Sequence, residues 1–156
     1  MIFVTIGMMY KFDRLIKAMD YVAGKIDEEI IMQIGKTSYV PKNAKYFRFI
    51  PEKDIKSLYI NARVVVCHAG VGSILTALHY NKPVIVVPRK KIEGEHVDNH
   101  QFEIARELEQ EGQIKVVYDV EEIEKTLNNP IISTMEIEKD RGLIERLKKY
   151  INGLAH

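Results

Sequence analysis

Short runs of β-branched and aliphatic residues alternate with segments of helical hydrophobic spacing along almost the whole chain. We expect strands at residues 2–6, 30–34, 46–50, 63–67, 83–87 and 114–118, and helices at residues 12–22, 52–61, 72–80, 98–111, 120–128 and 135–151. Strands that read as continuous apolar runs and alternate with helices predict a parallel sheet with helices on both faces. Because crossovers in such sheets are right-handed, the pattern favours a doubly wound, Rossmann-like α/β fold.

A chain of 156 residues is long enough for one domain with its own hydrophobic core. We therefore interpret residues 1–156 as a single domain, with a C-terminal helix at residues 135–153 that packs on the body of the domain or on a partner. The formal net charge of +1 gives no signal of nucleic-acid binding. Cys67 has no second cysteine to pair with, and neither a signal peptide nor a membrane-spanning run is evident, so we expect a cytoplasmic protein.

Ligands of doubly wound sheets bind beyond the carboxyl ends of the strands, near the point where the strand order reverses. The segments that follow the predicted strands at that edge are residues 7–10, 35–38, 49–52, 68–73 and 88–101. Gly7 and Gly35 each end a strand, where they are simple turn residues or let a ligand approach the backbone closely. The candidate site is built from these five segments.

The segment from His68 to Ser73, with the sequence HAGVGS, follows an apolar strand and begins a helix. Its glycines let the backbone approach a ligand, and the free N–H groups at a helix start favour an anion such as a diphosphate. Ser73 adds a hydroxyl donor or caps the helix. The same residues are compatible with a tight turn that binds nothing. Cys67 and His68 are strand neighbours that point to opposite faces, so they do not form a nucleophile–base pair.

Residues 88–101 are polar and include imidazole, carboxylate and amide groups. Such groups supply the mixed donors and acceptors that sugar hydroxyls require. Asp98 and Gln101 also have the spacing of a helix-capping box, which is a purely structural alternative. A metal site at His96, Asp98 and His100 is disfavoured because no further His or Cys cluster supports it.

Five ordered segments resemble the C-terminal, nucleotide-sugar-binding domain of glycosyltransferase family 28, which has the GT-B fold. Within this family the chain is similar to the small catalytic subunit of a two-chain transferase that adds the second N-acetylglucosamine to a lipid-linked diphosphate sugar. It is also similar to bacterial exopolysaccharide transferase subunits. The matching segments are residues 2–7, 32–36, 65–75, 81–88 and 98–105. Each lies at a predicted junction of strand, loop and helix, which makes the set more specific than one glycine motif.

The resemblance implies that the loop beginning at Gly7 faces the diphosphate of a UDP-sugar and that the turn at residues 70–73 lines the nucleotide. It also implies that residues 49–50 meet the uracil and that residues 100–101 bind the hydroxyls of the transferred sugar. The complete set of residues expected to bind the substrate is Gly7, Met8, Gly35, Phe49, Ile50, His68, Ala69, Gly70, Val71, Gly72, Ser73, Thr76, Arg89, Asp98, Asn99, His100 and Gln101.

One position departs from the family pattern. The family usually has a glutamate three residues after the motif serine, where it holds the ribose hydroxyls, and this sequence has Thr76 there. A threonine hydroxyl does not offer the bidentate acceptance of a carboxylate. The departure leaves open a second interpretation, a non-catalytic nucleotide-sugar-binding or scaffold subunit with a degenerate ribose site. A different enzyme on the same sheet, such as an epimerase or phosphatase, requires an acid–base set that the sequence does not offer.

The resemblance implies the donor-binding, catalytic subunit of an inverting glycosyltransferase, with UDP-N-acetylglucosamine as the expected donor. A membrane-anchored partner subunit is expected to bind the lipid-linked acceptor and to hold this chain peripherally at the membrane. The catalytic base is expected on the partner, with His96 and His100 as the candidates in this chain. No metal or cofactor is expected, because helix N-termini and basic groups such as Lys36 and Arg89 offset the diphosphate charge.

Overall fold

The computed structural model describes residues 1–95 and 100–130, together with four helical residues near the C-terminus, Gly142, Glu145, Arg146 and Lys149. The helix expected at residues 135–151 lies largely outside the described residues. Of its described part, Arg146 forms an ion pair with Glu111 and lies 3.7 Å from the carboxylate of Glu107. The packing surface of residues 135–153 stays a prediction.

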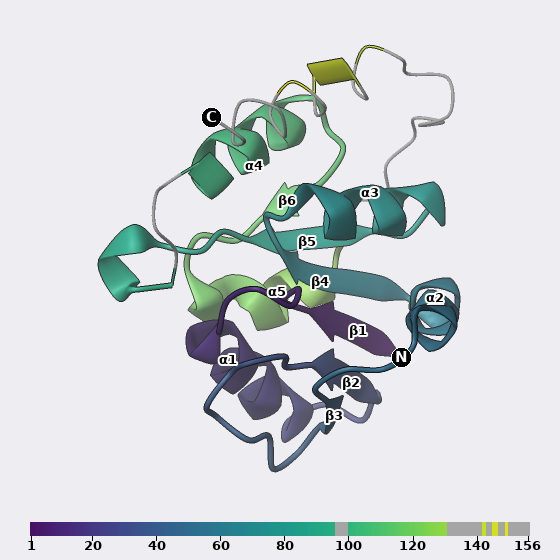
Figure 1. Ribbon diagram of the computed structural model, residues 1–156. Helices are drawn as coiled ribbons and strands as arrows, with labels where there is room; N and C mark the ends of the chain where they lie inside the picture. Colours follow the sequence, from purple (N-terminus) through teal and green to yellow (C-terminus); the bar gives the residue numbers. More distant parts are fainter. Residues whose placement is uncertain (96–99, 131–141, 143–144, 147–148, 150–156) are drawn as a thin grey trace.

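Six parallel strands form one sheet in the order β3-β2-β1-β4-β5-β6, which confirms the predicted doubly wound topology (Figure 1). The strands are β1 (Ile2–Thr5), β2 (Ile30–Gln33), β3 (Lys45–Phe47), β4 (Val64–His68), β5 (Val84–Val87) and β6 (Lys115–Val116). The central strands β1, β4 and β5 are fully buried, whereas the edge strand β3 is largely exposed. The strand expected at residues 46–50 ends early, and the Arg48 guanidinium donates hydrogen bonds to the carbonyl oxygens of Gly35 and Thr37.

Helices cover both faces of the sheet (Figure 1). On one face lie α1 (Asp13–Ala23) and α5 (Ile123–Leu127), and on the other lie α2 (Glu52–Asn61), α3 (Val71–His79) and α4 (His100–Gln110). Short 3-10 turns precede α4 and α5, namely η1 (Lys91–Glu93), which was not predicted, and η2 (Val120–Glu122). Among the described helices none combines the length and hydrophobicity needed to cross a bilayer.

The strand order reverses at β1, which pairs with β2 on one side and with β4 on the other. Thr5 is in register with Gln33 and with Cys67, so the carboxyl ends of all three strands lie at one edge. The chain leaves β1 toward α1 on one face and leaves β4 toward α3 on the opposite face. This divergence of the two loops opens a crevice between them, as in other doubly wound sheets.

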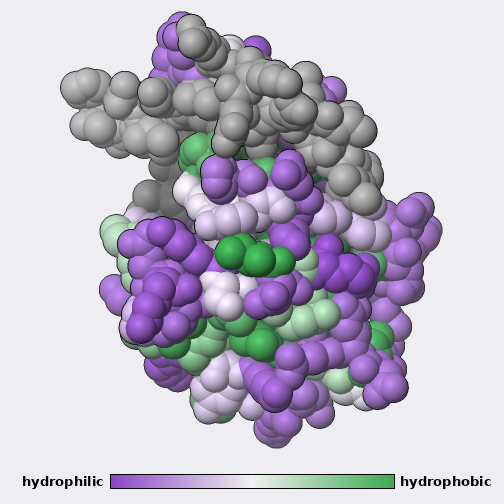
Figure 2. Space-filling model, turned by 90° about the vertical axis from the view of Figure 1, so that its right-hand side faces the viewer, coloured by the Kyte–Doolittle hydropathy of each residue, from purple (hydrophilic) through white to green (hydrophobic). Residues whose placement is uncertain are grey.

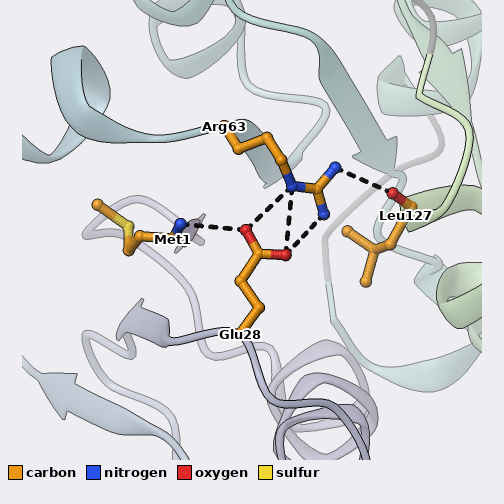
Figure 3. Close-up of polar contacts among 4 residues, drawn as sticks. All are labelled: Met1, Glu28, Arg63 and Leu127. Atoms are coloured by element: carbon orange, nitrogen blue, oxygen red, sulfur yellow. Dashed lines mark hydrogen bonds and ion pairs between the residues drawn. The ribbon is translucent and has the colours of Figure 1, made fainter.

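The amino ends of the strands lie on a mostly hydrophilic face with separate hydrophobic spots (Figure 2). Glu28, just before β2, accepts hydrogen bonds from Nε and Nη2 of Arg63 at 3.0 and 2.8 Å (Figure 3). The α-amino group of Met1 lies 3.0 Å from the same carboxylate, and Arg63 also donates to the carbonyl oxygen of Leu127 at 3.2 Å. The Arg63 guanidinium lowers the pKa of Glu28 to about 2, against the opposing effect of burial.

We expect Glu28→Gln to lower the free energy of unfolding by about 1–2 kcal/mol near neutral pH, a figure reduced because solvent screens this partly exposed pair. The folded pKa of about 2 lies below the ordinary value of 4.5, so the stabilisation is complete above pH 4.5 and is lost as the pH falls toward 2. The difference between wild type and variant in urea denaturation should therefore close over that range. Glu124→Gln, which removes an exposed pair with Lys25, is the control and should change stability little. A difference that does not vary with pH would contradict this assignment.

Candidate functional site

A pocket of about 330 Å³ opens at the carboxyl edge, between the end of β1 and the helices α2 and α3. The predicted residues that line it are Gly7, Met8, Gly72, Ser73 and Thr76. Glu52, the last residue of the candidate segment 49–52, lines the pocket as well, and the lining residues outside the candidate segments are Thr5, Gln33, Ile55, Lys56 and Tyr59. The loop after β1 and the glycine turn after β4, predicted from separate parts of the sequence, therefore share one pocket of a size typical for small ligands.

Neutral hydrogen-bonding groups form the inner wall of this pocket. The Thr5 hydroxyl donates to Oε1 of Gln33 at 2.5 Å, and both residues are buried. The hydroxyl of Tyr59 lies within hydrogen-bonding reach of those of Ser73 and Thr5, and burial raises its pKa well above the usual range. The wall therefore presents hydroxyl and amide groups that stay uncharged near neutral pH and match the hydroxyls of a sugar.

Helix α3 begins at the pocket. Its N-cap is Gly70, and Ser73 lies in the first turn and lines the pocket, so the alternative interpretation of Ser73 as the capping residue is wrong. The first turn of a helix leaves backbone N–H groups without intrahelical partners, and the helix dipole adds positive potential there. The start of α3 therefore favours an anionic group next to the hydroxyl-lined wall.

At three positions of this edge, the packing of the protein itself explains why the residue is glycine. A Cβ atom at Gly70 would lie 2.1 Å from Nε2 of His68, and one at Gly7 would lie 3.0 Å from Cε1 of the same ring. A Cβ atom at Gly35 would lie 3.0 Å from the carbonyl oxygen of Gly7. Gly7 and Gly35 also have positive φ angles of 71° and 47°, which glycine adopts without strain. The buried His68 imidazole thus lies against the backbones of Gly7 and Gly70, and a side chain at either position would come too close to the ring.

Gly72 differs from these glycines. A Cβ atom there would meet no protein atom within 4 Å, and the residue lines the pocket. The packing of the protein therefore does not require glycine at this position. Close approach of a ligand to the backbone, the reason expected for the whole turn, remains the prediction for Gly72.

Arg89 was expected to offset the charge of a diphosphate, but its side chain is 2% exposed and is turned into the protein. Its guanidinium donates to the carbonyl oxygens of Ile6 and Tyr10 at 2.7 and 2.9 Å and lies over the Phe12 ring at 4.9 Å. Burial lowers the pKa of Arg89 to about 10, which still leaves the group charged near neutral pH. Arg89 therefore holds the loop that follows β1 and is not among the residues that line the pocket.

A second arginine connects the same two segments from the other side, because it belongs to α1 and binds residues that follow β5. Arg14, at the start of α1, donates to the carbonyl oxygen of Pro88 at 2.9 Å and to both carboxylate oxygens of Glu95 at 2.7 and 3.0 Å. The buried Glu95 also accepts from the backbone N–H of Lys90 at 2.8 Å. The segment after β5 and the segment after β1 are thus joined by two arginines, one from each side.

Of the other predicted residues, those that the structure describes are not among the residues that line the pocket. Phe49 is exposed and Ile50 half-buried just before α2, whereas Gly35, His68 and Ala69 are buried and Val71 is half-buried. Lys36 is exposed beyond the end of β2. The positions that lie outside the described residues are His96, Asp98 and Asn99. His100 and Gln101 begin α4, but their side chains are outside the described part, so their sugar contacts stay a prediction.

Cys67 is fully buried in the core beneath α2 and α3. Burial raises the pKa of its thiol to about 12, so the group stays neutral and is not a nucleophile. Within the described residues, no group of three or more His, Cys, Asp or Glu side chains is placed to hold a metal ion.

The fold and the pocket define a doubly wound α/β domain with an anion-favouring, hydroxyl-rich ligand site at its switch point. Residues 1–149 match the family model of the glycosyltransferase family 28 C-terminal domain. The chain belongs to this family, and its fold is that of the C-terminal half of a GT-B glycosyltransferase.

Curated relatives carry the name UDP-N-acetylglucosamine transferase subunit ALG13. The protein of Candida albicans is 33% identical over 105 residues, which are 67% of this chain and 32% of that protein. The Homo sapiens protein is 34% identical over 124 residues, covering 72% of this chain and 10% of that protein. The protein of Eremothecium gossypii is 32% identical over 119 residues, covering 75% and 57%. The chain therefore spans less than two thirds of the length of each of these relatives.

Solved structures share the fold at low sequence identity. The solution structure of ALG13 has a TM-score of 0.60 and 21% identity, with 92% of this chain and 94% of that chain covered. The crystal structure of Acinetobacter baumannii MurG has a TM-score of 0.55 and 16% identity, with 80% and 40% covered. Both comparisons support the arrangement of strands and helices described above.

We expect Gly70→Ala to lower the free energy of unfolding by about 1–3 kcal/mol, because the new Cβ atom would displace a buried ring. Gly72→Ala is the matched control from the same turn. It should leave stability unchanged or raise it by up to about 1 kcal/mol, since alanine favours a helix and meets no protein atom there. Urea denaturation of the two variants tests this. An equal loss of stability in both would show that the His68 contact does not explain Gly70.

Proposed function

We propose that this chain is the donor-binding, catalytic subunit of an inverting glycosyltransferase. It transfers N-acetylglucosamine from UDP-N-acetylglucosamine to a lipid-linked diphosphate-sugar acceptor. The observation that carries the proposal is that the loop at Gly7 and the turn at Gly72 and Ser73 line one pocket at the switch point. Membership of glycosyltransferase family 28 supports the reaction class, and the names of the relatives support the donor.

The chemistry of the pocket fits a nucleoside diphosphate sugar. The first turn of α3 favours the diphosphate, and backbone dipoles rather than a metal ion offset its charge in this proposal. The hydroxyls of Thr5, Tyr59 and Ser73 offer both donors and acceptors to the hydroxyls of the ligand. Residues 98–101, which follow β5 in sequence, are proposed to bind the transferred sugar.

We further propose a membrane-anchored partner subunit that binds the acceptor and keeps this cytoplasmic chain at the membrane surface. Inversion places the attacking acceptor hydroxyl on the face of the sugar opposite the leaving UDP. The base that takes the proton of this hydroxyl must lie on the same side as the acceptor. A base on the partner meets this requirement, and His96 and His100 are the candidates within this chain. The word subunit in the names of the relatives supports the need for a partner.

Isothermal titration calorimetry should show binding of UDP and UDP-N-acetylglucosamine by the wild-type chain. Ser73→Ala should weaken UDP binding by about fivefold to tenfold, the effect of losing one hydrogen bond of about 1 kcal/mol. The control is Ser57→Ala, which changes an exposed serine of α2 that does not line the pocket. The proposal fails if no uridine nucleotide binds even when the partner is present.

A scaffold role without catalysis is the second candidate, and the state of Thr76 favours it. The Thr76 hydroxyl donates to the carbonyl oxygen of Gly72 at 2.7 Å, so its proton is used within α3. If the ribose site has degenerated at this position, Thr76→Glu should raise UDP affinity at least tenfold and produce transfer where the wild type has none.

For a working donor site, we expect Thr76→Glu to change UDP affinity by no more than about fivefold, because the added charge lies in a pocket that already contains a carboxylate. Calorimetry and a transfer assay with the partner separate the two candidates. Wild-type transfer activity excludes the scaffold role, and its absence together with rescue by Thr76→Glu establishes it.

A further inference from the structure

Among the described residues around the pocket, Glu52 supplies the one carboxylate. It is the first residue of α2, and its Oε1 lies 3.2 Å from Nζ of Lys56, one turn later in the helix. Lys56 also lines the pocket. The α2 wall is therefore the charged side of a pocket whose other polar side chains are hydroxyls and an amide.

Several neutral groups of the pocket have already used a hydrogen bond within the protein. Thr76 donates to the carbonyl oxygen of Gly72 at 2.7 Å, and Thr5 donates to Gln33 at 2.5 Å. A carboxylate has no proton to donate and accepts at about four lone-pair positions, of which the ion pair with Lys56 uses one. Glu52 can therefore accept two hydrogen bonds from neighbouring hydroxyls of a ligand.

We propose that Glu52 is a specificity-determining residue that binds the ribose of the nucleotide, with the 2′- and 3′-hydroxyls donating to its carboxylate. The inference rests on the proposed function, because it requires a ribonucleotide in the pocket. A vicinal diol presents two adjacent donors that match the two oxygens of a carboxylate, whereas a phosphate is repelled by its charge. A deoxyribonucleotide leaves one of these acceptors without a donor, so the pocket discriminates against it.

The experiment compares UDP with 2′-deoxy-UDP in calorimetric titrations of the wild type and of Glu52→Gln. The wild type should bind UDP about tenfold or more tightly than 2′-deoxy-UDP, the factor expected for a hydrogen bond to a charged group. Glu52→Gln should weaken UDP binding by a similar factor and affect 2′-deoxy-UDP little, so that the ratio of the two affinities approaches one.

Two variants control for charge and for the ion pair. Asp54→Asn removes an equal charge from the same exposed first turn of α2, at a residue that does not line the pocket, and should keep the preference for UDP. Lys56→Met breaks the ion pair but leaves the carboxylate, and should keep the preference as well. Loss of the preference in Asp54→Asn would mean that long-range charge, rather than contact with Glu52, produces it, and would overturn the inference.

The remaining outcomes separate this inference from the proposed function. Equal wild-type affinity for UDP and 2′-deoxy-UDP would overturn the inference and leave the proposed function intact. An unchanged preference for UDP in Glu52→Gln would have the same consequence. Weaker binding of UDP-N-acetylglucosamine but not of UDP by Glu52→Gln would assign the carboxylate to the transferred sugar and also overturn it. If the wild-type chain binds no uridine nucleotide, both the inference and the proposed function are contradicted.

Discussion

The His68 imidazole lies against the backbones of Gly7 and Gly70, so the loops that follow β1 and β4 pack closely around one ring and leave no room for a side chain at either glycine. The ring cannot move away from the glycines at low cost, because it is buried at the end of a fully buried strand. Gly35 extends the row of contacts to β2, since its Cα faces the carbonyl oxygen of Gly7 without room for a side chain. The packing of the loops that form the pocket therefore depends on the side chain of His68 and on Gly7, Gly35 and Gly70, which have no side chain.

Arg89 supports the same loop from inside the protein. Its two bonds to the carbonyl oxygens of Ile6 and Tyr10 fix the backbone on either side of Gly7. Arg14 and Glu95 then tie the start of α1 to the segment after β5. A loop restrained in this way loses less conformational entropy when a ligand orders it, which favours binding by a preformed backbone. Arg89 thus contributes to the geometry of the pocket through the backbone of this loop.

The sequence predicted all six strands, their parallel pairing and the two loops that share the pocket, because burial on both faces and glycine at strand ends leave clear local patterns. It did not predict the position of Arg89, whose partners lie 79 and 83 residues away along the chain. Asp20 is a similar case, since it is a charged residue of α1 that is buried. Burial alone would raise its pKa, but hydrogen bonds from the Tyr39 hydroxyl and from backbone N–H groups of residues 42–44 lower it. The sequence does not show that a charged residue is buried when its hydrogen-bonding partners come from a different segment of the chain.

The side chains that α2 contributes to the pocket follow a local pattern in the sequence. The residues of α2 that line the pocket are Glu52, Ile55, Lys56 and Tyr59, at intervals that place them on one face of a helix. This face mixes charged and apolar side chains, whereas a face that only packs on the sheet is apolar. In α3 the lining residues Gly72, Ser73 and Thr76 also share one face. The pocket is thus a groove between two helical faces above a fixed sheet edge. Substitutions on these faces can alter ligand preference while the His68 contacts and the strand order remain unchanged.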